Sequence, residues 1–151
     1  MELAKKINED LKQAMLAKDK RKLEALRAIK AALLLLKTGK DTGTTEVPET
    51  LELKTLQKLV KQRRESAELY KAQNRSDLYE EEVYQAEIIE AYLPKQMSED
   101  EIRDGVREII EQSGASSMKD MGRVMGMAAK KFAGKADNKT VSKIVKDILG
   151  A

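Results

Sequence analysis

The 151-residue sequence contains no cysteine and no histidine, and these two absences remove several classes of site. Without cysteine there is no disulfide framework, no thiolate nucleophile and no Cys/His zinc site. Without histidine the chain lacks the commonest general base near neutral pH. Catalysis would have to use Asp, Glu, Lys, Tyr or Ser. No catalytic constellation is visible in the sequence, and we expect neither a bound metal nor a cofactor.

Aromatic residues and long apolar segments are also scarce. There is no tryptophan, and aromatic residues make up only 3% of the chain, so Leu, Ile, Val, Met and Ala must fill the core. The longest strongly apolar run covers residues 33–36 and is flanked by Lys30 and Lys37. A membrane span needs roughly 18 apolar residues in a row. We therefore expect a cytoplasmic protein with no membrane partner.

What the sequence does contain is helical periodicity along nearly its whole length. Apolar residues recur at three- and four-residue spacing, and no segment shows the sustained two-residue alternation of a half-buried strand. The pattern predicts an all-α fold of about seven helices. Asp19 is a candidate cap for the second helix. Residues 38–47 have no apolar periodicity and are expected to form a loop, and Pro48 suits the first position of the third helix.

The clearest boundary follows residue 93. Pro94 ends the fourth helix, and Ser98 begins the segment SEDE, which is a capping box with Glu101 as its second member. Gly114 is expected to end the next helix in a left-handed conformation. These signals predict a four-helix unit over residues 1–93, a linker over 94–97 and a three-helix unit over 98–151.

The segment 120–137, DMGRVMGMAAKKFAGKAD, carries the most specific pattern in the chain. Gly122 and Gly126 lie inside an expected amphipathic helix, where each glycine costs roughly 1 kcal/mol relative to alanine. The preferred interpretation is that the glycines allow this helix to pack tightly against its neighbours. The alternative is that they bring the helix backbone close to a phosphate group.

Four segments in order resemble the YqeY-like family of small bacterial proteins. They are AKDKRKLEALRAIKAAL at 17–33, YLPKQMSEDE at 92–101, DMGRVMG at 120–126 and GKAD at 134–137. This family is similar to the C-terminal tail region of the B subunit of the glutamine-dependent aminoacyl-tRNA amidotransferase. In that enzyme the tail contacts the body of tRNA, and the part with the ATP-dependent chemistry has no counterpart in this chain.

The resemblance implies a non-catalytic module that interacts with tRNA, with a protein of the aminoacyl-tRNA pathway as a possible partner. A label of carbon–nitrogen ligase with glutamine as amido-N-donor would then describe a relative, or a complex to which this chain is accessory. A different class of function stays open, in which the helical grooves bind another polypeptide and the lysines only keep the protein soluble. The sequence names neither the tRNA nor the partner.

Basic residues near the C-terminus are the first candidates for an RNA-binding surface. The net charge of the whole chain is only +3, but residues 118–151 hold eight Lys or Arg against three Asp. Lysines on an exposed helix face often only keep the protein soluble. The resemblance favours phosphate binding. The candidates are Lys130, Lys131, Lys135, Lys139, Lys143 and Lys146.

A second basic patch lies in the expected third helix. It consists of Lys54, Lys58, Lys61, Arg63 and Arg64. This patch would either extend an RNA-binding surface or pair with the glutamates of the fourth helix. Phe132 is the only aromatic residue after position 93, so we expect any RNA contact to use shape and phosphates rather than base stacking.

Overall fold

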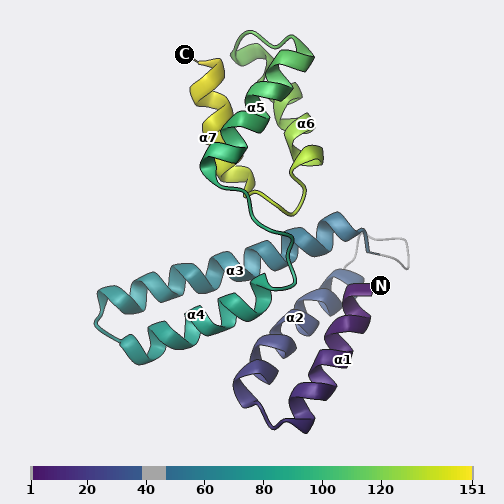
Figure 1. The fold of residues 1–151 in the computed structure, drawn as a ribbon, viewed down its shortest axis with the longest axis vertical. Coiled ribbons are helices and arrows are strands. Elements are labelled where there is room, and N and C mark those ends of the chain that lie inside the picture. The colour runs from purple at the N-terminus through teal and green to yellow at the C-terminus, as the bar shows by residue number, and fades with distance from the viewer. Residues whose placement is uncertain (1, 39–46, 151) are drawn as a thin grey trace. The chain divides into compact units, whose positions relative to one another are not determined.

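The computed structural model describes residues 2–38 and 47–150, and all regular structure in these residues is helical. This confirms the all-α prediction. The expected loop at 38–47 falls mostly on residues 39–46, which lie outside the described residues. The helices, drawn in Figure 1, are α1 Glu2–Leu16, α2 Lys20–Thr38, α3 Glu49–Ala72, α4 Ser76–Glu90, α5 Glu99–Ser113, α6 Met121–Lys131 and α7 Asn138–Leu149, with a short 3-10 turn at Met118–Asp120 before α6.

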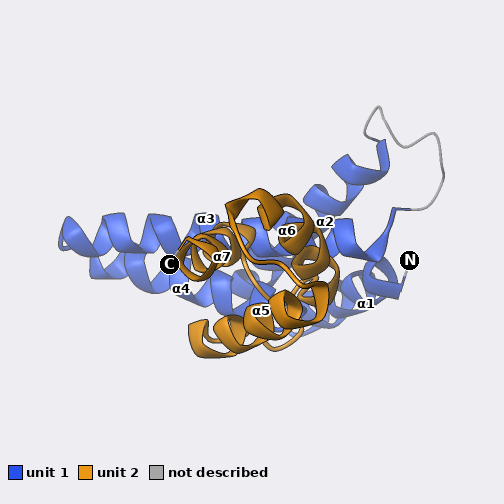
Figure 2. Cartoon of the chain, turned by 90° about the horizontal axis from the view of Figure 1, so that it is seen from above, with its two compact units in different colours: residues 1–93 blue, residues 94–151 orange. Residues whose placement is uncertain are grey.

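The chain divides into two compact units, Met1–Leu93 and Pro94–Ala151, coloured separately in Figure 2. Each unit encloses a core of its own. None of the described helices is long and apolar enough to cross a membrane.

In the N-terminal unit, α1 and α2 form one antiparallel pair and the longer α3 lies alongside α4 (Figure 1). Their apolar faces meet in a core in which the fully buried large side chains are Ile7, Leu26, Ile29, Leu56 and Ile89. Polar contacts also join these helices. The Arg64 guanidinium lies 3.0 Å from the Glu90 carboxylate, and the Tyr92 hydroxyl donates a hydrogen bond to the Asp10 carboxylate.

The breaks between these helices follow the local sequence signals. The Asp19 side chain accepts a hydrogen bond of 3.1 Å from the Lys22 N–H, as expected of a residue that caps α2. Pro48 directly precedes α3 instead of forming its first residue, a shift of one position from the expectation. Asn74 has φ of 58° in the turn between α3 and α4. Asparagine tolerates this left-handed region better than most residues, which favours the turn at this point.

The C-terminal unit begins with the predicted capping box. The Glu101 N–H donates to the Ser98 hydroxyl, and the Ser98 N–H donates to the Glu101 carboxylate, each at 3.1 Å. Gly114 ends α5 with φ of 71°, as predicted. The apolar faces of α5, α6 and α7 meet in a core that includes Val106, Ile109, Val124, Phe132 and Val145.

The expected tight packing at Gly122 and Gly126 is wrong. Both glycines are exposed, and a Cβ atom at either position would meet nothing within 4 Å. They lie on the face of α6 that points away from buried Val124 and Ala128. The close approach occurs elsewhere, where the Phe132 ring lies against the backbone of Gly105 in α5. The neighbouring helices cover the apolar stripe of α6, and the two glycines lie outside that stripe.

Candidate functional site

Helix α7 presents a lysine stripe on its outer face, formed by Lys139, Lys143 and Lys146. All three are exposed, and their spacing of four and three residues places them on one side of the helix. The opposite side is buried through Val141, Ile144, Val145 and Leu149. Among the described residues no carboxylate forms an ion pair with any of the three lysines. The stripe is therefore a set of like charges that no acidic neighbour in this part of the chain neutralises.

The other three lysine candidates lie at the end of α6 and in the turn that follows. Lys130 is exposed. The Lys131 ammonium lies 3.0 Å from the Glu108 carboxylate of α5, so its charge is partly matched within the unit. Lys135 is held through its backbone, because its carbonyl accepts a hydrogen bond of 2.9 Å from the Met97 N–H.

Lys131 and Lys135 also line a shared hollow with a lysine that the sequence reasoning missed. Lys95 joins them there, together with Glu101. The Gln96 amide donates hydrogen bonds to the carbonyls of Pro94 and Gly134, at 2.9 and 2.8 Å, which ties residues 94–97 to the turn after α6. Lys95 follows Pro94 directly in the predicted linker. Because Lys95 lies between two helices, no helical periodicity links it to the other lysines.

Two carboxylates of the C-terminal unit have a lowered pKa, which favours their ionised form. Hydrogen bonding to the Ser98 backbone lowers the pKa of Glu101, with a smaller contribution from the Lys95 charge. At the start of α6, a hydrogen bond from the Ser116 N–H lowers the pKa of Asp120, and the Arg123 guanidinium lies 3.2 Å from this carboxylate. The C-terminal unit therefore carries ionised carboxylates as well as lysines, and a polyanion would avoid the carboxylates.

The bare face of α6, formed by Gly122 and Gly126, lies on the same side of this helix as Lys130. With no side chain at either glycine, another molecule can approach the helix backbone closely. The sequence reasoning found the two glycines but assigned them to internal packing. The exposure of Gly122 and Gly126 becomes visible only in the folded unit.

The second basic patch divides into two parts. Arg63 donates hydrogen bonds to the Gln85 side chain at 3.2 Å and to the Leu59 carbonyl at 3.5 Å, and Arg64 pairs with Glu90. These two arginines serve the packing of α3 on α4, so the pairing interpretation applies to them. Lys54, Lys58 and Lys61 are exposed along α3. The patch belongs to the N-terminal unit, whereas the other candidates belong to the C-terminal unit.

Within residues 2–38 and 47–150 there is no cluster of three or more Asp or Glu side chains suited to hold a metal ion. The acidic residues of α4 are used differently. Glu81 and Glu90 pair with Arg21 and Arg64, both at 3.0 Å. Arg21 also lies over the Tyr84 ring, 4.0 Å from its centroid. This tyrosine therefore contributes to a contact between α2 and α4.

Comparison with known proteins identifies two fungal relatives that share a name. The chain is 32% identical to altered inheritance of mitochondria protein 41, mitochondrial, of Pyrenophora tritici-repentis, over 97% of this chain and 80% of the relative. It is 34% identical to the protein of the same name of Meyerozyma guilliermondii, over 80% of this chain and 64% of the relative.

These names contradict the expectation of a cytoplasmic protein, because both relatives are named as mitochondrial. That expectation was wrong in its reasoning as well. A charged composition without a long apolar run is compatible with every aqueous compartment, so it does not distinguish one from another.

The family assignment has broader support than these two relatives. The model of the family described as Yqey-like protein matches residues 4–149, which covers both compact units. The match includes all four segments on which the resemblance was based. The chain therefore belongs to the YqeY-like protein family.

Proposed function

We propose that this member of the YqeY-like family is a non-catalytic helical module that interacts with tRNA. The observation that carries the proposal is the lysine stripe of α7, where three exposed ammonium groups lie on one helix face without an acidic partner among the described residues. Lysines in this arrangement neutralise backbone phosphates and release condensed counterions. The resemblance of the chain to the tail of the amidotransferase B subunit supports tRNA as the polyanion.

The mode of contact that we propose uses phosphates and shape. Phe132, the one aromatic residue after position 93, is only 4% exposed and packs on Gly105. It is therefore not available to stack on a base, which is the usual means of reading single-stranded RNA. The bare face of α6 supports a close approach of the sugar–phosphate backbone beside Lys130.

The test is tRNA affinity measured across salt concentrations with the full chain. Replacing Lys139, Lys143 and Lys146 together with glutamine should weaken binding and reduce the slope of log K against log salt by about 2–3, roughly one unit per lost contact. A matched control replaces Lys5, Lys12 and Lys20, which are also exposed but lie in the other unit. The control has the same net charge as the first variant and should retain binding.

Two results would count against the proposal. Equal losses in both triple variants would indicate a response to net charge alone. Absence of tRNA binding at low salt by the folded protein would favour the alternative, a protein-interaction adaptor in which the lysines only solvate the surface. Circular dichroism of each variant verifies that the helices are retained.

The non-catalytic part of the proposal has its own assay. Purified protein incubated with glutamine, ATP, Mg²⁺ and mischarged tRNA should produce no transamidated product. Reproducible turnover would overturn this part. Stimulation of a separate amidotransferase by the added protein would support an accessory role in that reaction.

A further inference from the structure

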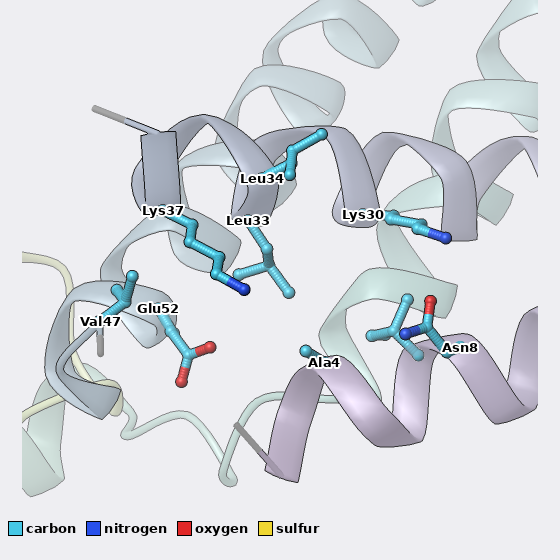
Figure 3. A pocket seen from close by; sticks show the side chains of 9 residues that line it. Ala4, Asn8, Lys30, Leu33, Leu34, Lys37, Val47 and Glu52 are labelled. Carbon is cyan, nitrogen blue, oxygen red and sulfur yellow. The ribbon is translucent and has the colours of Figure 1, made fainter. Parts of the chain in front are cut away.

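A hollow in the N-terminal unit shares no residue with the surfaces that we propose for RNA. It opens between α1, the end of α2 and the start of α3, and its volume is about 200 Å³. Figure 3 shows the side chains around it. Most of the lining is apolar and includes Ile7, Leu33 and Val47. Drug-sized ligands occupy cavities of roughly 300–1,000 Å³, so this hollow suits a smaller molecule.

Charges of both signs point into this apolar hollow. Glu52 is only 7% exposed, and its carboxylate is directed into the hollow, as is the ammonium group of Lys37 (Figure 3). Lys30 and Asn8 lie on the other side. Burying a carboxylate costs free energy unless cations or hydrogen-bond donors surround it. A ligand with a cationic group would therefore be stabilised beside Glu52.

The combination of charges narrows the class of ligand. A fatty acid would satisfy the lysines but would place no cation beside Glu52. A simple amine would satisfy Glu52 but would meet the positive charges of Lys30 and Lys37. A nucleotide exceeds the volume and carries several negative charges. A zwitterion with a short apolar side chain complements both signs of charge and the apolar lining.

We propose that this hollow binds a small aliphatic α-amino acid in its zwitterionic form. The ligand's ammonium group faces Glu52 and its carboxylate faces Lys37, which lies on the same side of the hollow. Its side chain packs against Ile7 and Leu33. This site uses none of the residues proposed to bind tRNA, so the failure of either proposal leaves the other in place.

The first experiment measures binding of L-leucine to the full chain by NMR titration or calorimetry. Three matched compounds each lack one part of leucine: 4-methylpentanoate lacks the ammonium group, isoamylamine lacks the carboxylate and glycine lacks the aliphatic side chain. We expect saturable binding of leucine and at least about tenfold weaker binding of each analogue. Burial of one methylene group is worth roughly fourfold in affinity, so glycine should lose more than tenfold.

Two substitutions then test the assignment of charges. Glu52→Gln should remove the preference for leucine over 4-methylpentanoate, and Lys37→Gln should remove the preference for leucine over isoamylamine. The matched control is Lys54→Gln, an exposed lysine of α3 that does not line the hollow. It should bind leucine like the unmodified protein.

The proposal is overturned if the folded protein shows no saturable leucine binding. It is also overturned if 4-methylpentanoate binds as tightly as leucine, because Glu52 would then have no role. An equal effect of Lys54→Gln and Lys37→Gln would show that the response follows net charge and not this hollow.

Discussion

The ring of Phe132, in the turn after α6, lies directly against the backbone of Gly105 in α5. A Cβ atom at position 105 would be 2.6 Å from the Cζ atom of this ring and 2.7 Å from Cε1. Both residues are buried, so the ring cannot move aside into solvent. Glycine at this position allows the one aromatic side chain of the C-terminal unit to fill its core.

The first prediction concerns this contact. Gly105→Ala should destabilise the C-terminal unit, because overpacking costs about 1–3 kcal/mol and opposes the gain of roughly 1 kcal/mol from helix propensity. Amide hydrogen exchange in α5 and α6 measures the change within this unit. Adding Phe132→Leu to Gly105→Ala removes the clash and should recover part of the loss. Slower exchange in Gly105→Ala than in the original protein would contradict the contact, because the alanine would then add helix propensity without a clash.

The second prediction has the opposite sign. Gly122→Ala and Gly126→Ala should each stabilise α6 by up to about 1 kcal/mol, because alanine favours a helix over glycine and the new methyl group meets no neighbour. Slower amide exchange in α6 would be the signature. Destabilisation by either substitution would restore the interpretation that the glycines pack against another helix.

The same two positions also test the bare face of α6 as a contact surface. Gly126→Leu places a bulky side chain on that face and should weaken tRNA binding without unfolding the unit. Ala31→Leu, at an exposed position of α2 in the N-terminal unit, serves as a matched control for added apolar surface. Equal tRNA affinity in the original protein and Gly126→Leu would exclude a close approach at this glycine.

A third prediction follows from the capping box of α5. Hydrogen bonding to the Ser98 backbone lowers the pKa of Glu101. The ionised Glu101 carboxylate therefore stabilises the folded protein fully above its unfolded-state pKa. This stabilisation is lost as the pH falls through the lower folded-state pKa. Glu101→Ala should destabilise the protein near pH 6 and have a smaller effect near pH 3.

The control for this prediction is Glu99→Ala, which removes an exposed carboxylate from the same turn of α5 without breaking the box. Ser98→Ala removes the other half of the box and should cost about 0.5–2 kcal/mol. Denaturation at several pH values measures all three variants. The same pH dependence for Glu99→Ala and Glu101→Ala would assign the effect to the helix dipole alone.

The fourth prediction concerns the hydrogen bond between Tyr92 and Asp10. Burial raises the pKa of the Tyr92 phenol, and the hydrogen bond to the Asp10 carboxylate raises it further. A raised folded-state pKa means that this stabilisation is complete below the unfolded-state value near 10 and is lost as the pH rises through the folded-state value. One tyrosine should therefore ionise later than free tyrosine in an alkaline spectrophotometric titration.

Tyr92→Phe should abolish that late step and cost roughly 1.5–3 kcal/mol, the range for hydrogen bonds to charged groups. All four tyrosines belong to the N-terminal unit, so tyrosine fluorescence reports the unfolding of this unit. Tyr79→Phe is a suitable control, because the Tyr79 ring lies 5.9 Å from the Lys71 ammonium group, a contact that does not require the hydroxyl. Persistence of the late step in Tyr92→Phe would assign it to another tyrosine.

Much of the fold was predictable because its signals act over a few residues. The capping box of Ser98 and Glu101 spans four residues, and Asp19 caps α2 through the Lys22 N–H. Gly114 takes the left-handed conformation that ends α5. Periodic apolar residues likewise predict which side of α7 is buried, and hence that Lys139, Lys143 and Lys146 share its outer face.

The candidate sites were less predictable, since they depend on residues far apart in the chain. Lys95 joins Lys131 and Lys135 only because backbone hydrogen bonds bring residues 94–97 to the turn after α6. Glu52 has an acidic side chain and is yet buried, beside a hollow that α1, the end of α2 and the start of α3 line together. Lys95 carries no periodic signal, and Glu52 lies in register with Leu56 on the buried face of α3, where its acidic side chain hides its burial from a reading based on apolar residues.

The amino-acid sequence by itself determined the helices, their ends and the family, because periodicity, capping and motif order are properties of neighbouring residues. The tertiary structure alone decided which glycine makes a close contact. Gly122 and Gly126 share a conspicuous spacing and lie on an open face, whereas Gly105 meets a ring 27 positions away. The physical reason is that packing depends on which helix faces meet in space, and a local pattern carries no information about the partner that approaches it.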